Sequence, residues 1–198
     1  MTPKISDKAL GISTNGVLSL QDFQFSHVNL SHARRYEATP YHILDDMLID
    51  VHADFRDFAF IDLGSGKGRV TILACQLPFK KVIGVEFVPR LVKQARANHG
   101  KIRPNVSLCS DIEFVSGDAA EYEFPRLPLV IYLFNPFTEV VLTKVLRNLS
   151  RSLSAKPRAV FIMYYMPEFE DSFGDFPEFT KTAMARDWSI FQNEESLK

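Results

Sequence analysis

A glycine-rich segment carries the clearest chemical signal in this chain. Asp62-Leu63-Gly64-Ser65-Gly66-Lys67-Gly68 follows an apolar run over residues 58–63 and precedes a helical pattern over residues 69–77. Glycines in such a turn adopt positive φ angles and let a ligand approach the backbone closely. The first turn of the following helix offers unpaired N–H groups to a negatively charged group. The segment therefore predicts a binding site for a nucleotide-related ligand.

Two common nucleotide-binding patterns do not fit the spacing of this segment. A P-loop needs four residues between its first glycine and Gly-Lys-Ser/Thr, whereas Gly66-Lys67 is followed by Gly68. The dinucleotide fingerprint Gly-x-Gly-x-x-Gly needs a third glycine where Arg69 stands. The pattern present is Asp-x-Gly-x-Gly-x-Gly, which resembles the first motif of the Rossmann-like (class I) S-adenosylmethionine-dependent methyltransferases. The resemblance extends over residues 36–165.

Acidic residues that end two later apolar runs fit the same resemblance. Glu86 ends the run over residues 81–86, and Asp118 follows the run over residues 112–116. The resemblance implies that Glu86 accepts hydrogen bonds from the two ribose hydroxyls of S-adenosylmethionine. It also implies that Asp118 faces the adenine amine beside the backbone N–H of Ala119. A Rossmann dehydrogenase places an acid near the position of Glu86 too, so Glu86 alone does not separate the two classes.

A second motif, Asn135-Pro136-Phe137, follows the apolar run over residues 129–134. It resembles the Asn/Asp-Pro-Pro-Tyr/Phe motif of methyltransferases that act on the amino groups of adenine, cytosine or glutamine, with one proline missing. In that family the Asn oxygen and the next carbonyl accept hydrogen bonds from the target nitrogen, and the aromatic ring packs on its planar group. The resemblance favours nitrogen as the methyl acceptor.

The segment before the first predicted helix supports a related resemblance. Tyr36-Glu37-Ala38-Thr39-Pro40, a helix and the glycine segment follow one another as in the protein-lysine methyltransferases of the telomeric-silencing and ATP synthase c-subunit types. The resemblance implies that Tyr36 and Thr39 lie over the methionine end of the cofactor. For an ammonium acceptor, Tyr36, Glu37 or water could remove the proton, and the sequence does not choose among them.

These comparisons define the expected site. The expected cofactor-binding residues lie in the glycine segment and at the strand ends: Asp62, Gly64, Ser65, Gly66, Gly68, Glu86, Phe87, Asp118, Ala119 and Asn135. The expected catalytic residues lie on the acceptor side: Asn135, Pro136, Phe137 and Tyr36. The five histidines and two cysteines show no metal-ligand spacing, so no metal is expected.

The elements that must position these residues alternate along the chain. Short, continuously apolar strands separated by helices predict a Rossmann-like, doubly wound, mostly parallel sheet that is covered on both faces. The predicted strands span residues 58–63, 81–86, 112–116, 129–134 and 158–165, and the predicted helices span residues 40–51, 69–77, 89–99 and 138–153. Residues 179–183 and 188–192 predict an antiparallel hairpin at the sheet edge.

Length and composition indicate one domain. The chain has 198 residues, 46% of them hydrophobic, and a formal net charge of -1. Residues 1–35 are expected to form an irregular N-terminal arm and residues 36–198 the cofactor-binding methyltransferase domain. The balanced charge gives no general attraction to nucleic acid. The absence of a long apolar run and of a secretory signal predicts a cytoplasmic protein without a membrane span.

The sequence thus predicts a methyltransferase that acts on a nitrogen of a protein side chain or of a small molecule. Three alternatives remain open: a non-catalytic S-adenosylmethionine-binding module, an aminopropyltransferase, and an NAD-dependent oxidoreductase. Lys67 and Arg69 are expected to face solvent in preference to holding the cofactor's carboxylate. Cys75 is expected to be buried and Cys109 to be exposed.

Overall fold

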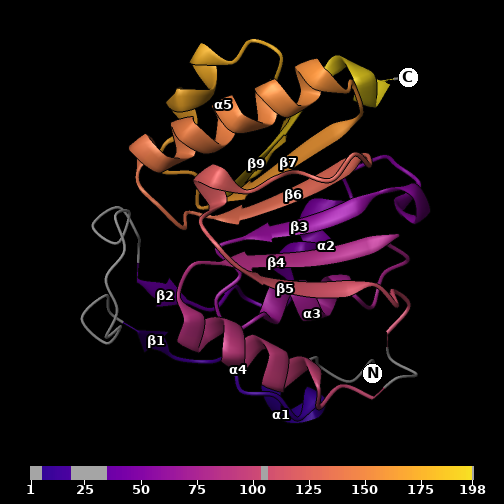
Figure 1. The fold of residues 1–198 in the computed structure, drawn as a ribbon, viewed down its shortest axis with the longest axis vertical. Helices are drawn as coiled ribbons and strands as arrows, with labels where there is room; N and C mark the ends of the chain where they lie inside the picture. The colour runs from indigo at the N-terminus through magenta and orange to yellow at the C-terminus, as the bar shows by residue number, and fades with distance from the viewer. Residues whose placement is uncertain (1–5, 19–34, 104–106, 198) are drawn as a thin grey trace.

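A computed structural model describes residues 6–18, 35–103 and 107–197, and its main feature there is a seven-stranded sheet (Figure 1). In spatial order the strands are β5 (Ile112–Ser116), β4 (Lys81–Glu86), β3 (Ala59–Leu63), β6 (Leu129–Phe134), β7 (Val160–Tyr165), β9 (Trp188–Gln192) and β8 (Thr180–Met184). β3 pairs in parallel with β4 on one side and with β6 on the other. The winding therefore reverses at β3, which confirms the predicted Rossmann-like sheet.

The predicted C-terminal hairpin is also confirmed. β9 is antiparallel to β8 and also to β7, so the hairpin extends the parallel sheet at one edge. The turn between its strands is closed by the backbone N–H of Ala185, which donates to the carbonyl of Trp188 at 2.9 Å.

Helices cover both faces of the sheet. They are α2 (Ile43–Leu48), α3 (Arg69–Ala74), α4 (Pro89–His99) and α5 (Glu139–Ala155). α5 packs on the face that carries Ile61 and Ile131, whereas α2 and α3 pack on the face that carries Phe60 and Val130. α4 lies beside α3, where Val92 contacts the same cluster as Ile72 and Phe114. Burial on both faces explains why the strands read as continuous apolar runs.

The residues that predict helix ends lie at or near the observed ends of the helices. α4 begins at Pro89, where a missing N–H costs nothing, and Gly100 is its C-cap residue. α3 ends earlier than predicted, at Ala74. The N–H groups of Gln76 and Leu77 bond to carbonyls three residues back, so the chain leaves the α-helix through a tighter turn.

The described part of residues 1–35 contains two small elements that lie near α4 (Figure 1). They are α1 (Asp7–Leu10) and β1 (Val17–Leu18), and β1 pairs antiparallel with β2 (Tyr36–Glu37). Residues 1–5 and 19–34 of the expected arm lie outside the described residues. Among the helices that the structure describes, none has the length and apolar character to cross a membrane.

Candidate active site

The glycine loop lies at the carboxyl end of β3 and packs against the turn after β6. Gly64 and Gly66 have φ angles of 80° and 55°, which residues other than glycine rarely adopt. A Cβ atom on Gly64 would overlap the ring of Pro136. The two motifs recognised in the sequence therefore meet, and they form neighbouring parts of one cavity wall.

Glu86 is the last residue of β4, and its carboxylate is fixed beneath the glycine loop. Its Oε2 accepts a hydrogen bond from the N–H of Gly66 at 2.9 Å, and its Oε1 accepts one from the N–H of Val88 at 2.9 Å. The residue is 5% exposed and lines the cavity. Burial raises the pKa of Glu86, while these backbone hydrogen bonds act in the opposite direction. Since a carboxylate has about four lone-pair sites, Glu86 can still accept two hydrogen bonds from neighbouring hydroxyls.

The next wall of the cavity follows β5. Asp118 caps the short helix η5 (Ala119–Glu121), and its Oδ1 accepts a hydrogen bond from the N–H of Ala120 at 2.9 Å. Gly117, Asp118 and Ala119 line the cavity together with the apolar side chains of Phe87 and Leu91. An acid beside apolar side chains suits a flat ring that carries an amino group.

Asp62 forms the floor of the cavity under the loop. Its Oδ2 accepts hydrogen bonds from the Thr71 N–H at 3.2 Å and from the Thr71 hydroxyl at 2.8 Å. The residue is 3% exposed, and burial raises its pKa to about 7. The hydrogen bonds from Thr71 act to lower this pKa, whereas the nearby Glu86 adds to the rise. An acid in this state ionises more readily when a cation enters the cavity.

The raised pKa of Asp62 predicts a pH dependence of stability. Because the folded pKa of about 7 lies above the ordinary value of 3.8, this contribution to stability is fully present below pH 3.8 and is lost as the pH rises through 7. Between about pH 4.5 and about pH 7.5 we expect wild type to lose roughly 3 kcal/mol more unfolding free energy than Asp62→Asn. Asparagine can keep both bonds from Thr71, because both reach one oxygen. Urea unfolding at the two pH values measures this, and equal losses would contradict it.

Tyr36 covers the glycine loop from the opposite side. A Cβ atom on Gly66 would overlap the ring of Tyr36, and the Tyr36 hydroxyl donates a hydrogen bond to the carbonyl of Thr14. Burial raises the pKa of Tyr36 well above its usual value, so the phenol is neutral at physiological pH. The ring therefore acts as a neutral wall that excludes water, and its pKa argues against Tyr36 as a proton acceptor.

This contact makes Gly66 a sensitive position. Gly66→Ala places a methyl group against Tyr36 at a backbone φ of 55°, so the ring must move and the loop is strained. We expect a loss of about 2 kcal/mol in unfolding free energy. Gly174→Ala is the matched control, because a Cβ atom there meets nothing within 4 Å. Thermal or urea unfolding that shifts equally for the two variants would contradict the close contact.

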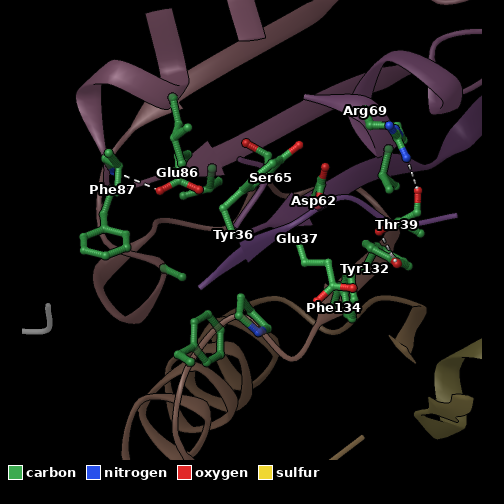
Figure 2. Close-up of a pocket in the computed structure, with 18 of the residues that line it drawn as sticks. Tyr36, Glu37, Thr39, Asp62, Ser65, Arg69, Glu86, Phe87, Tyr132 and Phe134 are labelled. Carbon is green, nitrogen blue, oxygen red and sulfur yellow. Dashed lines mark hydrogen bonds between the residues drawn. The ribbon is translucent and has the colours of Figure 1, made fainter. Parts of the chain in front are cut away.

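The other end of the cavity is built from hydroxyls and aromatic rings. Figure 2 shows Thr39, Tyr132 and Phe134 away from Glu86, with Tyr36 between the two ends. The hydroxyls of Thr39 and Tyr132 share a hydrogen bond of 2.9 Å. Thr39 was expected here from the resemblance, whereas Tyr132 was not recognised in the sequence. Register could have identified it, because Tyr132 is the β6 partner of Asp62 on β3.

Asn135 lies just after β6 but does not line the cavity. Its φ angle is 39°, its Nδ2 donates to Oε2 of Glu168 at 2.8 Å, and its Oδ1 accepts from the Tyr164 hydroxyl at 3.2 Å. Glu168 follows β7, so the C-terminal part of the chain contacts the Asn-Pro-Phe motif directly. The amide oxygen keeps a second lone pair beyond its bond from Tyr164.

The structure brings most of the expected residues to one cavity. Those that line it are Tyr36, Asp62, Gly64, Ser65, Glu86, Phe87, Asp118, Ala119, Pro136 and Phe137. Gly66, Gly68 and Asn135 do not line it. Gly66 is covered by Tyr36, and a Cβ atom on Gly68 would lie 2.9 Å from the side chains of Ala95 and Phe114. Gly68 therefore lets the loop pack against α4 and β5.

Two expectations about polar and thiol groups are wrong. Lys67 and Arg69 are 7% and 6% exposed, so neither faces solvent. Lys67 donates to the carbonyl of Asn15 at 2.7 Å, because the chain before the first predicted helix folds over this side of the loop. Cys109 is buried like Cys75, since its N–H bonds to the Cys75 carbonyl at 3.1 Å and draws the segment before β5 against the end of α3.

Comparison with known proteins relates this chain to methyltransferases. Residues 60–156 match the family model described as methyltransferase domain, while no curated protein sequence matches the chain. An RNA methyltransferase from Salinibacter ruber, solved with S-adenosyl-L-homocysteine, is 24% identical with a TM-score of 0.50, over 78% of this chain and 91% of that one. Magnesium protoporphyrin IX methyltransferase from Synechocystis, solved with S-adenosylmethionine, is 15% identical with a TM-score of 0.54, over 77% of each chain. The ribosomal protein L11 methylase of Lactobacillus delbrueckii is 16% identical with a TM-score of 0.52, over 77% of this chain and 76% of that one.

The structural likenesses establish the fold, and the family model establishes the domain. Residues 60–156 therefore form a methyltransferase domain, and the sheet has the Rossmann-like (class I) fold. The cavity fits S-adenosylmethionine, the cofactor that the sequence resemblance implies: Glu86 offers a buried carboxylate for hydroxyls, and Phe87 and Leu91 offer an apolar surface for a ring. The Ser65 hydroxyl is buried and finds no hydrogen-bond partner among the residues that the structure describes, so it is available to a ligand.

Proposed function

We propose that the protein transfers a methyl group to a nitrogen atom of a protein side chain or of a small molecule. The observation that carries the site assignment is the buried carboxylate of Glu86, which is held by the Gly66 and Val88 N–H groups while it lines the cavity. When bound, S-adenosylmethionine supplies a methyl group that is already activated on a sulfonium sulfur. The protein must therefore align two partners and exclude water, which can supply much of the rate gain.

The residues of this chain divide that work along the cavity. We assign Glu86 to the ribose hydroxyls, and Asp118 with the Ala119 backbone to the adenine ring. Gly64, Ser65 and Asp62 shape the methionine end, where the ionised form of Asp62 favours a cation. Gly66 lets the Tyr36 ring pack closely on the loop, and Gly68 lets the loop pack against α4.

The acceptor must lie beside the methionine end, because the methyl group is transferred from the sulfonium sulfur there. Pro136, which packs against Gly64, and Phe137 line the cavity, and they follow Asn135, whose oxygen has a lone pair to accept from an N–H group. An amine conjugated into an amide or a base has little lone-pair density, so an acceptor oxygen that binds its hydrogens aims the nitrogen at the methyl group. The aromatic rings of Tyr36 and Phe137 exclude water from this end.

Labelled methyl transfer into fractionated cell extract tests the proposal. S-adenosylmethionine that carries labelled methyl is incubated with the protein and extract, and protein and small-molecule fractions are counted separately. We expect label in one fraction, and we expect it to resist mild base, because N-methyl groups survive where methyl esters hydrolyse. Label that base releases contradicts the nitrogen assignment. Tight cofactor binding without transfer to any fraction indicates the non-catalytic alternative.

A further inference from the structure

Arg69, the first residue of α3, joins three segments of the chain through one guanidinium group. Its Nε donates to Oγ1 of Thr14 at 2.7 Å, and its Nη1 donates to the carbonyl of Thr39 at 2.7 Å. Its Nη2 lies 3.4 Å from Oδ1 of Asp7 and also donates to Oδ1 of Asn15. A planar fork of five N–H donors suits such a junction, and lysine cannot reproduce it.

The carboxylate of Asp7 completes this junction from the N-terminal side. Its Oδ2 accepts from the N–H groups of Thr14 at 2.7 Å and of Asn15 at 2.9 Å. Its Oδ1 accepts from the hydroxyls of Thr14 and Tyr41, each at 2.5 Å. Burial raises the pKa of Asp7, but these hydrogen bonds outweigh burial and lower it to about 2. Asp7 is therefore ionised and paired with Arg69, so the buried charges are compensated.

The junction holds the wall of the cavity from behind. The carbonyl of Thr39 accepts a hydrogen bond from Arg69, and its hydroxyl shares one with the Tyr132 hydroxyl (Figure 2). Both Arg69 and Tyr132 line the cavity. The Tyr36 hydroxyl donates to the carbonyl of Thr14, and Arg69 donates to the hydroxyl of the same residue. The ribbon of β1 and β2 is only two residues long on each strand, and so short a ribbon cannot hold itself. The polar junction must therefore supply the order of residues 35–39.

We infer that Arg69 is a positioning residue of the cofactor site, and that docking of residues 7–15 is coupled to cofactor binding. The inference rests on the proposed assignment of the cavity to S-adenosylmethionine. Loss of Arg69 leaves Asp7 buried without its cation, which releases residues 7–15 and loosens the wall at Tyr36 and Thr39. By linkage, bound cofactor strengthens docking by the same factor by which docking strengthens cofactor binding.

Calorimetric titration with S-adenosylhomocysteine is the first test. We expect Arg69→Lys and Arg69→Gln to raise its Kd by about 10- to 100-fold, within the usual range of such coupling. Arg158→Lys is the matched control. Arg158 is also buried, but its guanidinium donates to the carbonyls of Ser152 and Lys156 and it does not line the cavity. We expect Arg158→Lys to lower the Tm while leaving the Kd unchanged.

Two further measurements cover a variant that fails to fold. Thr14→Val keeps Arg69 and Asp7 but removes the hydroxyl between them, and we expect a Kd rise in the same direction but smaller. Trypsin cleavage after the exposed Lys8, followed by mass spectrometry, reports docking directly. We expect S-adenosylhomocysteine to slow this cleavage by about tenfold in wild type, and to protect the Arg69 variants far less.

The outcomes separate the inference from the function on which it rests. Arg69 variants that bind with the wild-type Kd, or wild type whose cleavage at Lys8 ignores the ligand, overturn the inference alone. Wild type that binds no S-adenosylhomocysteine overturns the cofactor assignment and the inference with it. A Kd that rises for Arg69 and Thr14 variants but not for Arg158→Lys supports the inference.

Discussion

Glu86→Ala is expected to weaken S-adenosylmethionine binding by about 100-fold. The carboxylate is 5% exposed and is held by two backbone N–H groups, so it is ready to accept bonds from two ribose hydroxyls. Hydrogen bonds to a charged group contribute about 1.5–3 kcal/mol each, and about 1.4 kcal/mol corresponds to tenfold in affinity. The variant also leaves the N–H of Gly66 without its acceptor, which loosens the loop. Isothermal titration of the purified variant measures the change.

Glu113→Ala is the control for this experiment. Glu113 lies on the neighbouring strand β5, pairs with Lys81 at 3.1 Å, and does not line the cavity. Its removal is expected to leave the affinity within about twofold of wild type, because an exposed ion pair contributes little. If Glu86→Ala bound the cofactor as tightly as Glu113→Ala, the assignment of the ribose to Glu86 would be wrong.

Asn135→Ala is expected to lower the rate of methyl transfer by about 100-fold, the usual effect of removing one oriented polar group at a reacting centre. The effect should fall on kcat, because we assign Asn135 to the acceptor and its side chain bonds to Glu168 and Tyr164, neither of which is assigned to the cofactor. Labelled transfer into the responsive extract fraction measures the rate, and calorimetry measures cofactor affinity.

Two companion variants separate chemistry from structure at Asn135. Its φ angle of 39° is tolerated by asparagine and glycine but strains alanine, so Asn135→Gly removes the carboxamide without that strain. We expect the glycine variant to lose as much activity as the alanine variant. Asn148→Ala removes an asparagine that donates to the carbonyl of Tyr122 on the α5 side, and it should keep its activity. A glycine variant with wild-type activity would show that the carboxamide has no part in the reaction.

The order of elements could be predicted from the sequence because each carries a strong local signal. Continuously apolar strands such as residues 129–134 are typical of a sheet buried on both faces, and Pro89 and Gly100 mark the ends of one helix. The strand ends that carry Glu86 and Asp118 followed from the same pattern. Once the sheet is parallel, these ends meet at one edge, and the cavity lies there.

The contacts made by residues 7–15 could not be predicted in this way. Their partner Arg69 is distant in sequence, and a charged residue after a glycine loop is usually exposed. Burial of Arg69 depends on Asp7, which no local pattern connects to it. The orientation of Asn135 was hidden for the same reason, since it is set by Tyr164 on β7 and by Glu168 after that strand.

A side-by-side comparison of two cofactors tests the central claim most directly. Wild-type protein is titrated with S-adenosylmethionine and, separately, with NAD under the same conditions. The cavity at Glu86 and the glycine loop predicts saturable binding of S-adenosylmethionine at one site and no measurable binding of NAD. Binding of NAD in preference to S-adenosylmethionine, or no binding of either, would contradict the account.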